Sequence, residues 1–397
     1  MLDSLFIKNF RLLEDLSVAH LGRLNLIVGK NNSGKSSVLE ALRVYAGCAQ
    51  RSVLEAIAGE RNERIRSSDE PTSEDDVPLP FQDFFSGRVF PEDDICIEIG
   101  RSSADPGVVR VKRVYLVEFE ETVTEPAGET TQRVRRRLAS RSEVEGEGLD
   151  LFHPVSPALQ VTKGTRTFLP ILLDSSGRTR LGEPGLDASA VLPCAVVSTR
   201  PGSLDDLADD WDRIVFSEHE QTIREAMQII EPDFEDLTFV KADSMATVIA
   251  GVRRPPNRAL MRTPVVKLSN VSRPVPLNSL GDGMLRLLQI LLKVYPAKGG
   301  LLLIDEFENG LHYSVQEKVW ALLFDLAQRL DIQVFATTHS WDCIESFARV
   351  ARERKDVEGV LFRVGRSVRN SDRGKVVATV FDEEALYAIT QSDVEVR

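Results

Sequence analysis

The segment Gly29–Ser36 constrains this chain more than any other, because it reads Gly-x-x-x-x-Gly-Lys-Ser between a predicted strand and a predicted helix. The strand covers residues 24 to 28 and ends at a glycine. The helix is indicated by apolar side chains recurring at i, i+3, i+4 and i+7, which are Val38, Ala41, Leu42 and Tyr45. Backbone N–H groups that converge at the start of such a helix bind phosphate oxygens. The pattern therefore predicts a phosphate-binding loop at the edge of a sheet.

The side chains of this loop have distinct predicted roles. Lys35 is expected to reach the β and γ phosphates of a bound nucleotide, and the Ser36 hydroxyl is expected to bind Mg²⁺. Further nucleotide contacts are expected from Gly29, Asn31, Asn32, Ser33, Gly34 and Ser37. The alternative is a glycine-rich turn that binds nothing, which the agreement of strand, loop and helix disfavours.

A fully apolar stretch, Leu301–Ile304, ends abruptly in two carboxylates. Such a run is typical of a strand inside a parallel sheet. Asp305 is placed at its carboxyl end to hold Mg²⁺, and Glu306 is placed to polarise an attacking water as a general base. The alternative is a strand exit capped by solvated acids, which the loop at 29–36 makes less favoured.

Two histidines follow this strand. His339 comes just after the predicted strand Ile332–Thr338, where it is placed to contact the γ phosphate and sense hydrolysis. The alternative is a helix-entry histidine beside the cap residue Ser340. His312 begins another predicted helix, and a histidine in that position is often merely solvated.

A second candidate anion site opens the apolar helix Met284–Tyr295. Small polar residues and glycines at a helix start bind anions, and here they are Ser279, Gly281, Asp282 and Gly283. An ordinary capped helix is the alternative. A second site this close in sequence to the strand 301–304 resembles the arrangement of ABC-type ATPases, and this resemblance implies contact with the γ phosphate of a nucleotide held by another subunit.

These motifs, in this order and spacing, resemble those of ABC-type ATPases in the RecF, SMC and OLD families. The opening Ile7–Arg11 also resembles the first strand of that group. The resemblance implies an α/β head with a mixed β lobe, a parallel catalytic sheet and an inserted helical lid. It implies Mg²⁺-dependent ATP hydrolysis in a head-to-tail dimer of two chains, with Arg11 near the nucleotide. By residue chemistry alone, Arg11 equally indicates a surface arginine.

The sequence departs from the family pattern at two places. Leu280 replaces the first glycine of the signature, although Ser279 and Gly281 remain usable. The family's glutamine, which is a second Mg²⁺ ligand, has no convincing counterpart. The segment Val197–Arg200 holds that position by order, and Gln82 is a weak candidate.

The predicted organisation has three parts. Residues 1–200 form an N-terminal ATPase lobe with β insertions, residues 201–240 a helical lid, and residues 241–397 a C-terminal ATPase lobe. The acidic stretch 59–94 is predicted to be a surface insertion. A final helix at 384–389 is expected to follow strands at 360–364 and 376–381.

Nucleic acid is a candidate partner through local contacts only, because the net charge of −12 disfavours general attraction to phosphates. Residues 118–141 predict a long hairpin, on which Arg133, Arg135 and Arg137 share one face. These arginines could contact backbone phosphates. If the hairpin turns near residues 126 and 127, however, Glu118 lies opposite Arg135 and Glu120 opposite Arg133, and cross-strand ion pairs are expected instead. A further group of arginines lies in a loop with proline, where solvated charges are expected, and comprises Arg253, Arg254, Arg258 and Arg262.

A cytoplasmic protein is expected, since no apolar run approaches a membrane span and the four cysteines form no Cys-x-x-Cys pair. The chain resembles stand-alone OLD-like ATPases of abortive-infection and antiphage operons. The 58 residues after His339 are too few for the nuclease domain of OLD proteins. We therefore expect a separate effector, a nuclease or toxin, that the ATPase gates. The alternative function is a RecF-like DNA-repair ATPase that binds DNA when ATP is bound.

Overall fold

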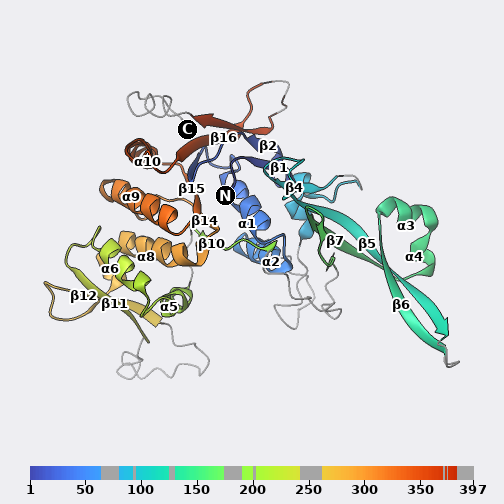
Figure 1. The fold of residues 1–397 in the computed structure, drawn as a ribbon, viewed down its shortest axis with the longest axis horizontal. Helices are drawn as coiled ribbons and strands as arrows, with labels where there is room; N and C mark the ends of the chain where they lie inside the picture. The colour runs from blue at the N-terminus through green and yellow to red at the C-terminus, as the bar shows by residue number, and fades with distance from the viewer. Residues whose placement is uncertain are drawn as a thin grey trace.

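The computed structural model describes residues 1–63, 80–92, 95–124, 130–173, 190–199, 203–241, 262–369, 372 and 374–381. Figure 1 shows a body of sheets and helices from which a long hairpin projects to one side. The described residues form a mostly parallel sheet, an antiparallel sheet and a small three-stranded sheet.

The central sheet carries strands from both ends of the chain. Its six strands lie in the order β10 (Cys194–Val197), β14 (Leu301–Ile304), β15 (Gln333–Thr338), β3 (Leu24–Val28), β16 (Gly359–Arg366) and β17 (Val376–Phe381). Neighbouring strands are parallel except for β17, which pairs with β16 antiparallel. Since parallel strands place their carboxyl ends along one edge, the ends of β10, β14, β15 and β3 meet there.

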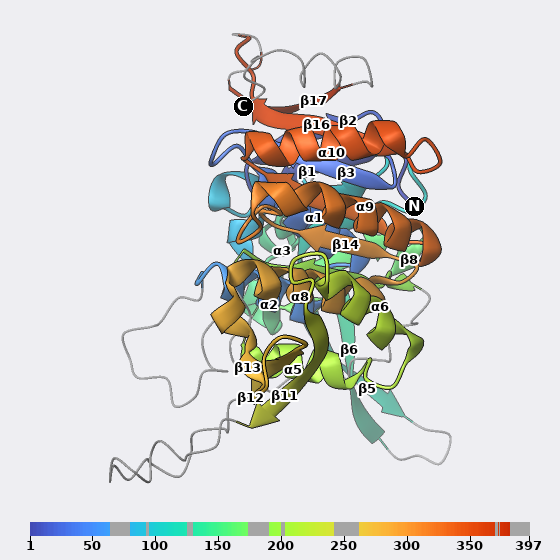
Figure 2. The ribbon, with the colours of Figure 1, turned by 90° about the vertical axis from the view of Figure 1, so that its left-hand side faces the viewer.

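Helices cover both faces of this sheet. On one face lie α8 (Asp282–Val294), α9 (Tyr313–Arg329) and α10 (Trp341–Glu353), and Figure 2 shows α9 and α10 side by side. On the other face lie α1 (Lys35–Ala46) and then α2 (Arg51–Glu60). This accounts for the continuous apolar run of β14, because a strand covered on both faces has no polar side.

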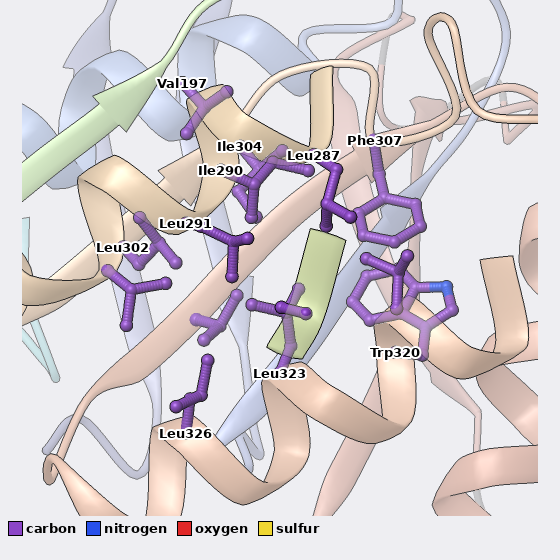
Figure 3. Close-up of a cluster of buried hydrophobic side chains, with 14 of the residues drawn as sticks. Val197, Leu287, Ile290, Leu291, Leu302, Ile304, Phe307, Trp320, Leu323 and Leu326 are labelled. Carbon is purple, nitrogen blue, oxygen red and sulfur yellow. The ribbon is translucent and has the colours of Figure 1, made fainter. Parts of the chain in front are cut away.

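Successive side chains of β14 enter different cores. Leu302 and Ile304 pack with α8 and α9, as the close-up in Figure 3 shows, whereas Leu301 and Leu303 pack with α1 and the β lobe. All four side chains are at most 2% exposed. Complete burial of an aliphatic side chain stabilises a fold by about 1.5–3 kcal/mol. Strand β14, which directly precedes Asp305, is therefore packed on both of its faces.

The β lobe is an antiparallel sheet packed against α1. It comprises β1 (Leu5–Phe10), β2 (Leu13–Val18), β4 (Ile97–Gly100), β5 (Val109–Thr124), β6 (Thr130–Ala139), β7 (Val155–Lys163), β8 (Arg166–Thr167) and β9 (Ile171–Leu172). Together with the parallel sheet it confirms the predicted α/β class with a separate β lobe.

The predicted hairpin is confirmed as β5 and β6, but its predicted register is wrong by one residue. Glu118 lies opposite Arg136, and Glu120 lies opposite Val134. Arg136 Nε donates to Glu118 Oε1 at 2.8 Å, so a cross-strand ion pair forms with a different arginine from the one expected. Thr124 pairs with Thr130, so an odd number of residues, 125–129, connects the two strands. The predicted pairs require an even number, and the difference shifts every cross-strand pair by one residue.

Two short helices, α3 (Arg141–Glu147) and α4 (Leu149–Phe152), pack beside this hairpin. They bury Val144 and Leu149 against Val117 and Ala139. Arg137 reaches α3 by pairing with Glu147 at 3.2 Å. The hairpin is thus a small packed unit with its own apolar cluster.

The lid segment contains α5 (Leu204–Asp212) and α6 (Glu218–Met227), and both helices match the predicted apolar patterns. They pack against α8 together with a three-stranded sheet that the sequence did not predict: β11 (Phe234–Lys241), β12 (Arg262–Leu268) and β13 (Val275–Pro276). Arg262 pairs with Asp212 at 2.7 Å. Arg253, Arg254 and Arg258 lie outside the described residues.

The acidic insertion is not entirely at the surface. The 3₁₀ turn Phe81–Phe84 and the next residue bury three phenylalanines, Phe81, Phe84 and Phe85, in the core beside β1. Residues 64–79 and 93–94 of the insertion, and the predicted helix at 384–389, lie outside the described part of the chain. None of the helices in the described part has the length and apolar character needed to cross a membrane.

Candidate functional site

The phosphate-loop segment connects β3 to α1 at the carboxyl edge of the central sheet. Gly29 has φ 151°, and a Cβ there would lie 2.2 Å from the carbonyl oxygen of Val364. Gly34 has φ 104° and directly precedes the helix. Both positions require glycine, because a side chain would clash or adopt a strained backbone. The loop conformation therefore explains why residues 29 and 34 are glycines.

The Lys35 ammonium lies inside this loop. Its Nζ donates to the carbonyl oxygens of Gly29 at 2.7 Å and Lys30 at 3.1 Å. Burial lowers the pKa of Lys35 from its ordinary value, and the nearby carboxylates of Asp305, Glu308 and Glu306 oppose that shift. The loop's own carbonyls thus hold a desolvated cation where the nucleotide phosphates are expected.

The Asp305 carboxylate accepts hydrogen bonds from hydroxyl groups of three separate elements. Thr337, in β15, donates to Oδ1 at 2.6 Å. Thr199, just after β10, donates to Oδ2 at 3.1 Å. Ser36, at the start of α1, lies 3.3 Å from Oδ2 and 3.4 Å from Oδ1. The structure therefore brings the two predicted metal ligands, Ser36 and Asp305, together.

Glu306 has a left-handed backbone conformation, with φ 49°. Such a conformation costs of the order of 1 kcal/mol or more for a residue with a Cβ and persists only where neighbouring contacts fix it. Thr337 Oγ1 accepts from Glu306 N at 2.8 Å, and Thr337 O accepts from Phe307 N at 2.9 Å. The buried Phe307 ring stacks on Trp320 with centroids 3.8 Å apart. These contacts turn the chain sharply at the candidate general base.

Arg286, in the second turn of α8, lies beneath this turn. Its guanidinium is buried and donates to the carbonyl oxygens of Ser198 at 2.8 Å, Asp305 at 2.6 Å and Glu306 at 2.8 Å. Burial lowers the pKa of Arg286, while the negative charges of Asp305, Glu308 and Glu306 act in the opposite direction. The arginine therefore ties α8 to the ends of β10 and β14.

His339 lies at the same edge and is oriented by a carboxylate. Its Nδ1 lies 3.0 Å from Glu308 Oε1, which also accepts from the His339 backbone N–H at 3.0 Å. The side chain of His339 is 52% exposed, so it faces open space beyond the strand end. His312 instead caps α9, with Nδ1 accepting from Ser314 N at 3.4 Å.

The candidate signature forms a 3₁₀ turn, Leu277–Leu280, and the start of α8. Ser279 is exposed, and its Oγ donates to Pro276 O at 2.6 Å. Gly281 has φ 94°, and a Cβ there would meet no atom within 4 Å. At Gly283 a Cβ would lie 3.0 Å from Gly310 O, so the signature packs closely on the segment that follows β14. Ser279 and Gly281 therefore face open space.

Arg11 is not a surface residue, because it is only 7% exposed. Its Nε lies 2.6 Å from Glu40 Oε2, and its Nη1 lies 2.8 Å from Glu63 Oε1. The guanidinium also lies 4.9 Å from the centre of the Phe84 ring. Burial raises the pKa of Glu40, which the charges of Arg11 and Arg61 partly offset. The predicted approach of Arg11 to a nucleotide stays a prediction.

Four residues at the site were not singled out from the sequence: Thr199, Arg286, Asn309 and Thr337. Asn309 joins two loops, since its Nδ2 donates to the carbonyl oxygen of Thr199 at 3.0 Å. Thr199 lies in the segment that the motif order placed at the missing glutamine. For the others the sequence carries no specific signal, because threonine in a strand and arginine in a helix are ordinary.

The oxygen atoms gathered here suit Mg²⁺. A carboxylate and hydroxyls are hard donors, and Mg²⁺ is usually held by one or two protein oxygens together with phosphates and waters. Asp305 and Ser36 provide such donors beside the phosphate loop. The residues present therefore fit the expected metal ion.

Two family models match the sequence around this site. Residues 1–70 match the model described as "AAA ATPase domain". Residues 252–342 match the model described as "AAA domain, putative AbiEii toxin, Type IV TA system". The first match contains the phosphate loop, and the second contains the signature, Asp305, Glu306 and His339.

Comparisons with individual proteins add distant relatives. An "ATP/GTP phosphatase" of Helicobacter pylori is 22% identical over 370 residues, covering 89% of each chain. A protein of Methanocaldococcus jannaschii is 49% identical over 45 residues, which is 11% of this chain and 20% of that protein. Together, the two domain matches and the first relative support one class: this chain is an ATP-hydrolysing enzyme with a P-loop.

Among solved structures, the chain is similar to heads of SMC proteins. An SMC head bound to the C-terminal winged-helix domain of ScpA gives a TM-score of 0.46 at 14% identity, covering 96% of this chain and 98% of that one. The SMC head of Thermotoga maritima gives a TM-score of 0.39 at 14% identity, covering 96% and 99%.

Proposed function

We propose that this chain binds ATP with Mg²⁺ at the loop 29–36 and hydrolyses it in a site completed by a second copy of the chain. The observation that carries the proposal is the meeting of Ser36, Asp305 and Glu306 at the carboxyl edge of one sheet. A phosphate loop, a metal-binding carboxylate and an adjacent general base are the parts that phosphoryl transfer to water requires.

Lys35 supplies the main protein cation for the phosphates. Its Nζ donates to the carbonyl oxygens of Gly29 and Lys30. The β and γ phosphate oxygens are stronger acceptors, because they carry full negative charge. The loop N–H groups and the start of α1 orient the same phosphates. Ser36 and Asp305 would hold the Mg²⁺ ion, which would supply positive charge to offset that of the phosphates.

Glu306 activates the water. Its carboxylate accepts a proton as the water oxygen forms a bond to the γ phosphorus, and the bond to the β–γ bridging oxygen breaks, releasing ADP and phosphate. The left-handed turn at Glu306 is held by the hydrogen bonds that Thr337 makes to the backbone N–H groups of Glu306 and Phe307. His339, whose Nδ1 lies 3.0 Å from Glu308 Oε1, would donate a hydrogen bond to the γ phosphate.

The proposed head-to-tail dimer is supported by the open signature. Ser279 is exposed, and the space around Gly281 is free within 4 Å. Both residues lie at the start of an α-helix of 13 residues, where a phosphate is favoured. Ser279, Gly281, Asp282 and Gly283 of one subunit would then close on the γ phosphate held by its partner.

The division of the chain into residues 1–200, 201–240 and 241–397 remains a proposal, and β11 (Phe234–Lys241) crosses its second boundary to pair with β12. The first and last parts each contribute strands to the central sheet, and the lid packs on the signature helix α8. Closure of two subunits on ATP would therefore move the lid together with α8.

We further propose that this closure gates a separate effector, a nuclease or toxin, in antiphage or abortive-infection defence. The domain model matched by residues 252–342 is described as "AAA domain, putative AbiEii toxin, Type IV TA system", which supports this context. The alternative is a RecF-like DNA-repair ATPase. The hairpin arginines favour it less, since Arg136 and Arg137 pair with Glu118 and Glu147.

One experiment separates these uses. The purified protein is assayed for release of phosphate from ATP and from GTP, and for binding and cleavage of plasmid, linear DNA and tRNA with Mg²⁺ or Mn²⁺. ATP hydrolysis without cleavage, and with a protein that co-purifies from the native host, supports gating. ATP-dependent DNA binding by the chain alone supports the repair function, and cleavage that is lost in Glu306→Gln contradicts both.

A further inference from the structure

The hydroxyls around Asp305 fall into two groups. The Thr337 hydroxyl donates to Asp305 Oδ1 at 2.6 Å and accepts from Glu306 N at 2.8 Å. It therefore links the Asp305 carboxylate to the backbone turn at Glu306. Thr199 instead approaches the other carboxylate oxygen, Oδ2, at 3.1 Å, and Ser36 lies between the two oxygens, 3.3 Å from Oδ2 and 3.4 Å from Oδ1. Thr199 therefore shares its oxygen with the residue that is the expected metal ligand.

The position of Thr199 is fixed by its backbone. The carbonyl oxygen of Val197 accepts from Asp305 N at 2.9 Å, continuing the pairing of β10 with β14. Arg286 donates to Ser198 O at 2.8 Å, and Asn309 donates to Thr199 O at 3.0 Å. Three consecutive carbonyls are thus held by groups from β14, α8 and the segment after β14. A side chain placed in this way is pre-organised for binding.

The chemistry of this cluster is that of a metal site. Asp305 Oδ2, Ser36 Oγ and Thr199 Oγ1 are neighbouring hard oxygens from three separate elements. Mg²⁺ prefers such ligands in an octahedral arrangement. Thr199 is also half-buried.

On the basis of the proposed function, we infer that Thr199 supplies a hydroxyl ligand to the nucleotide-bound Mg²⁺ ion, at the position where the resembling families have a glutamine. The hydroxyl leaves Asp305 Oδ2 when the metal ion binds, as Ser36 does, while Thr337 stays on Oδ1. A short side chain suffices here because the end of β10 lies directly beside Asp305.

The test measures equilibrium binding of a fluorescent, non-hydrolysable ATP analogue with EDTA, Mg²⁺ or Cd²⁺. In the natural protein, Mg²⁺ is expected to tighten binding. Thr199→Val should lose about 10-fold or more of this tightening, since even outer-shell partners of a metal contribute 10–100-fold. Its affinity in EDTA should be unchanged, and Thr199→Ser should keep the tightening.

Thiol substitution separates a ligand from a residue that only positions Asp305. Thr199→Cys should bind the analogue weakly with Mg²⁺ and regain affinity with Cd²⁺, because a sulfur ligand prefers the softer ion. Thr337→Cys is the matched control, since this hydroxyl also touches Asp305, and it should show no such preference. The natural protein in Cd²⁺ controls for its own cysteines, and thermal melting checks that each variant folds.

Either of two results overturns the inference: full Mg²⁺ tightening in Thr199→Val, or the same response to Cd²⁺ in both cysteine variants. Neither result affects the proposed ATPase function, provided that the natural protein binds the analogue more tightly with Mg²⁺. If the natural protein does not bind the analogue at all, the proposed nucleotide site itself is wrong.

Discussion

Arg286 Nη2 donates to the carbonyl oxygen of Glu306 at 2.8 Å, which connects the signature helix to the candidate general base of the same subunit. The same nitrogen donates to Asp305 O at 2.6 Å. Arg286 lies one turn after Gly283 in α8, and Gly283 packs against Gly310. A displacement of α8 on contact with a partner's nucleotide would therefore be transmitted directly to the backbone of Asp305 and Glu306.

Replacing Arg286 by methionine should destabilise the fold by about 3 kcal/mol, because buried carbonyls lose a charged donor. The free energy of unfolding in urea measures this. ATP hydrolysis should also fall, since the turn at Glu306 loses its support. Arg286→Lys keeps the positive charge but loses the two-pronged geometry. Its free energy of unfolding should therefore lie between those of the natural protein and of Arg286→Met. An unfolding free energy equal to that of the natural protein would show that these hydrogen bonds contribute little.

Lys35→Ala should abolish tight ATP binding, because the phosphates lose their main protein cation. Equilibrium binding of labelled ATP checks this. Lys30→Ala is the matched control, since Lys30 lies in the same loop with its side chain exposed. The control should bind ATP normally. Unchanged affinity in Lys35→Ala would show that the nucleotide binds elsewhere.

ATP affinity should decline as the pH rises, beginning below the ordinary lysine value of 10.5, because burial lowers the pKa of Lys35 in the free protein. Only the protonated ammonium attracts phosphates, so the affected range begins at a lower pH than for an exposed lysine. Binding of ATP should be accompanied by proton uptake in that range. Calorimetry in buffers of different ionisation enthalpy measures the uptake, and its absence would mean that Lys35 is fully charged before ATP binds.

Much of the catalytic edge could be predicted from the sequence, because its elements are local. The strand at 24–28, the loop at 29–36 and the apolar strand before Asp305 each carry their own signal within a few residues. The parallel sheet then follows, since apolar strands with helices between them have few other arrangements. The meeting of Ser36 and Asp305 at one edge is a consequence of that topology.

The remainder depends on contacts between distant segments. Thr199 and Asp305 are 106 positions apart, and nothing near either residue announces their hydrogen bond. The hairpin register depended on a turn whose length the sequence left open, so a one-residue error changed the partner of Glu118. Arg11 was ambiguous for the same reason, because its partner Glu63 is 52 positions away.

Glu306→Gln should keep ATP binding but slow hydrolysis by about 10²–10⁴, the usual contribution of a positioned general base. ATP would then accumulate in closed dimers, which light scattering after size exclusion detects. Glu353→Gln, at the exposed far end of α10, is a control that removes one charge without touching the site. Normal turnover by Glu306→Gln would remove this residue from the mechanism.

The proposed site shared between two subunits makes a prediction about mixtures of two inactive variants. Ser279→Arg places a bulky side chain at an exposed position of the signature, whereas Lys35→Ala removes the buried cation of the phosphate loop. If each site joins the loop of one subunit to the signature of the other, neither variant alone has a complete site. A heterodimer, however, has one intact site and one site with both defects. At equal concentrations about half of the dimers are mixed, so the mixture should recover up to about a quarter of the natural activity.

Phosphate release is measured for each variant alone, for the mixture, and for the mixture with each chain at half concentration. Recovery should fall when the chains are diluted below the dissociation constant of the dimer, because the active species is bimolecular. A chain carrying both substitutions is the matched control and should not rescue either parent. If the mixture remains as inactive as its parents although mixed dimers form on ATP, each subunit does not complete its partner's site. If Ser279→Arg alone keeps full activity, the turn before α8 is not part of the catalytic machinery.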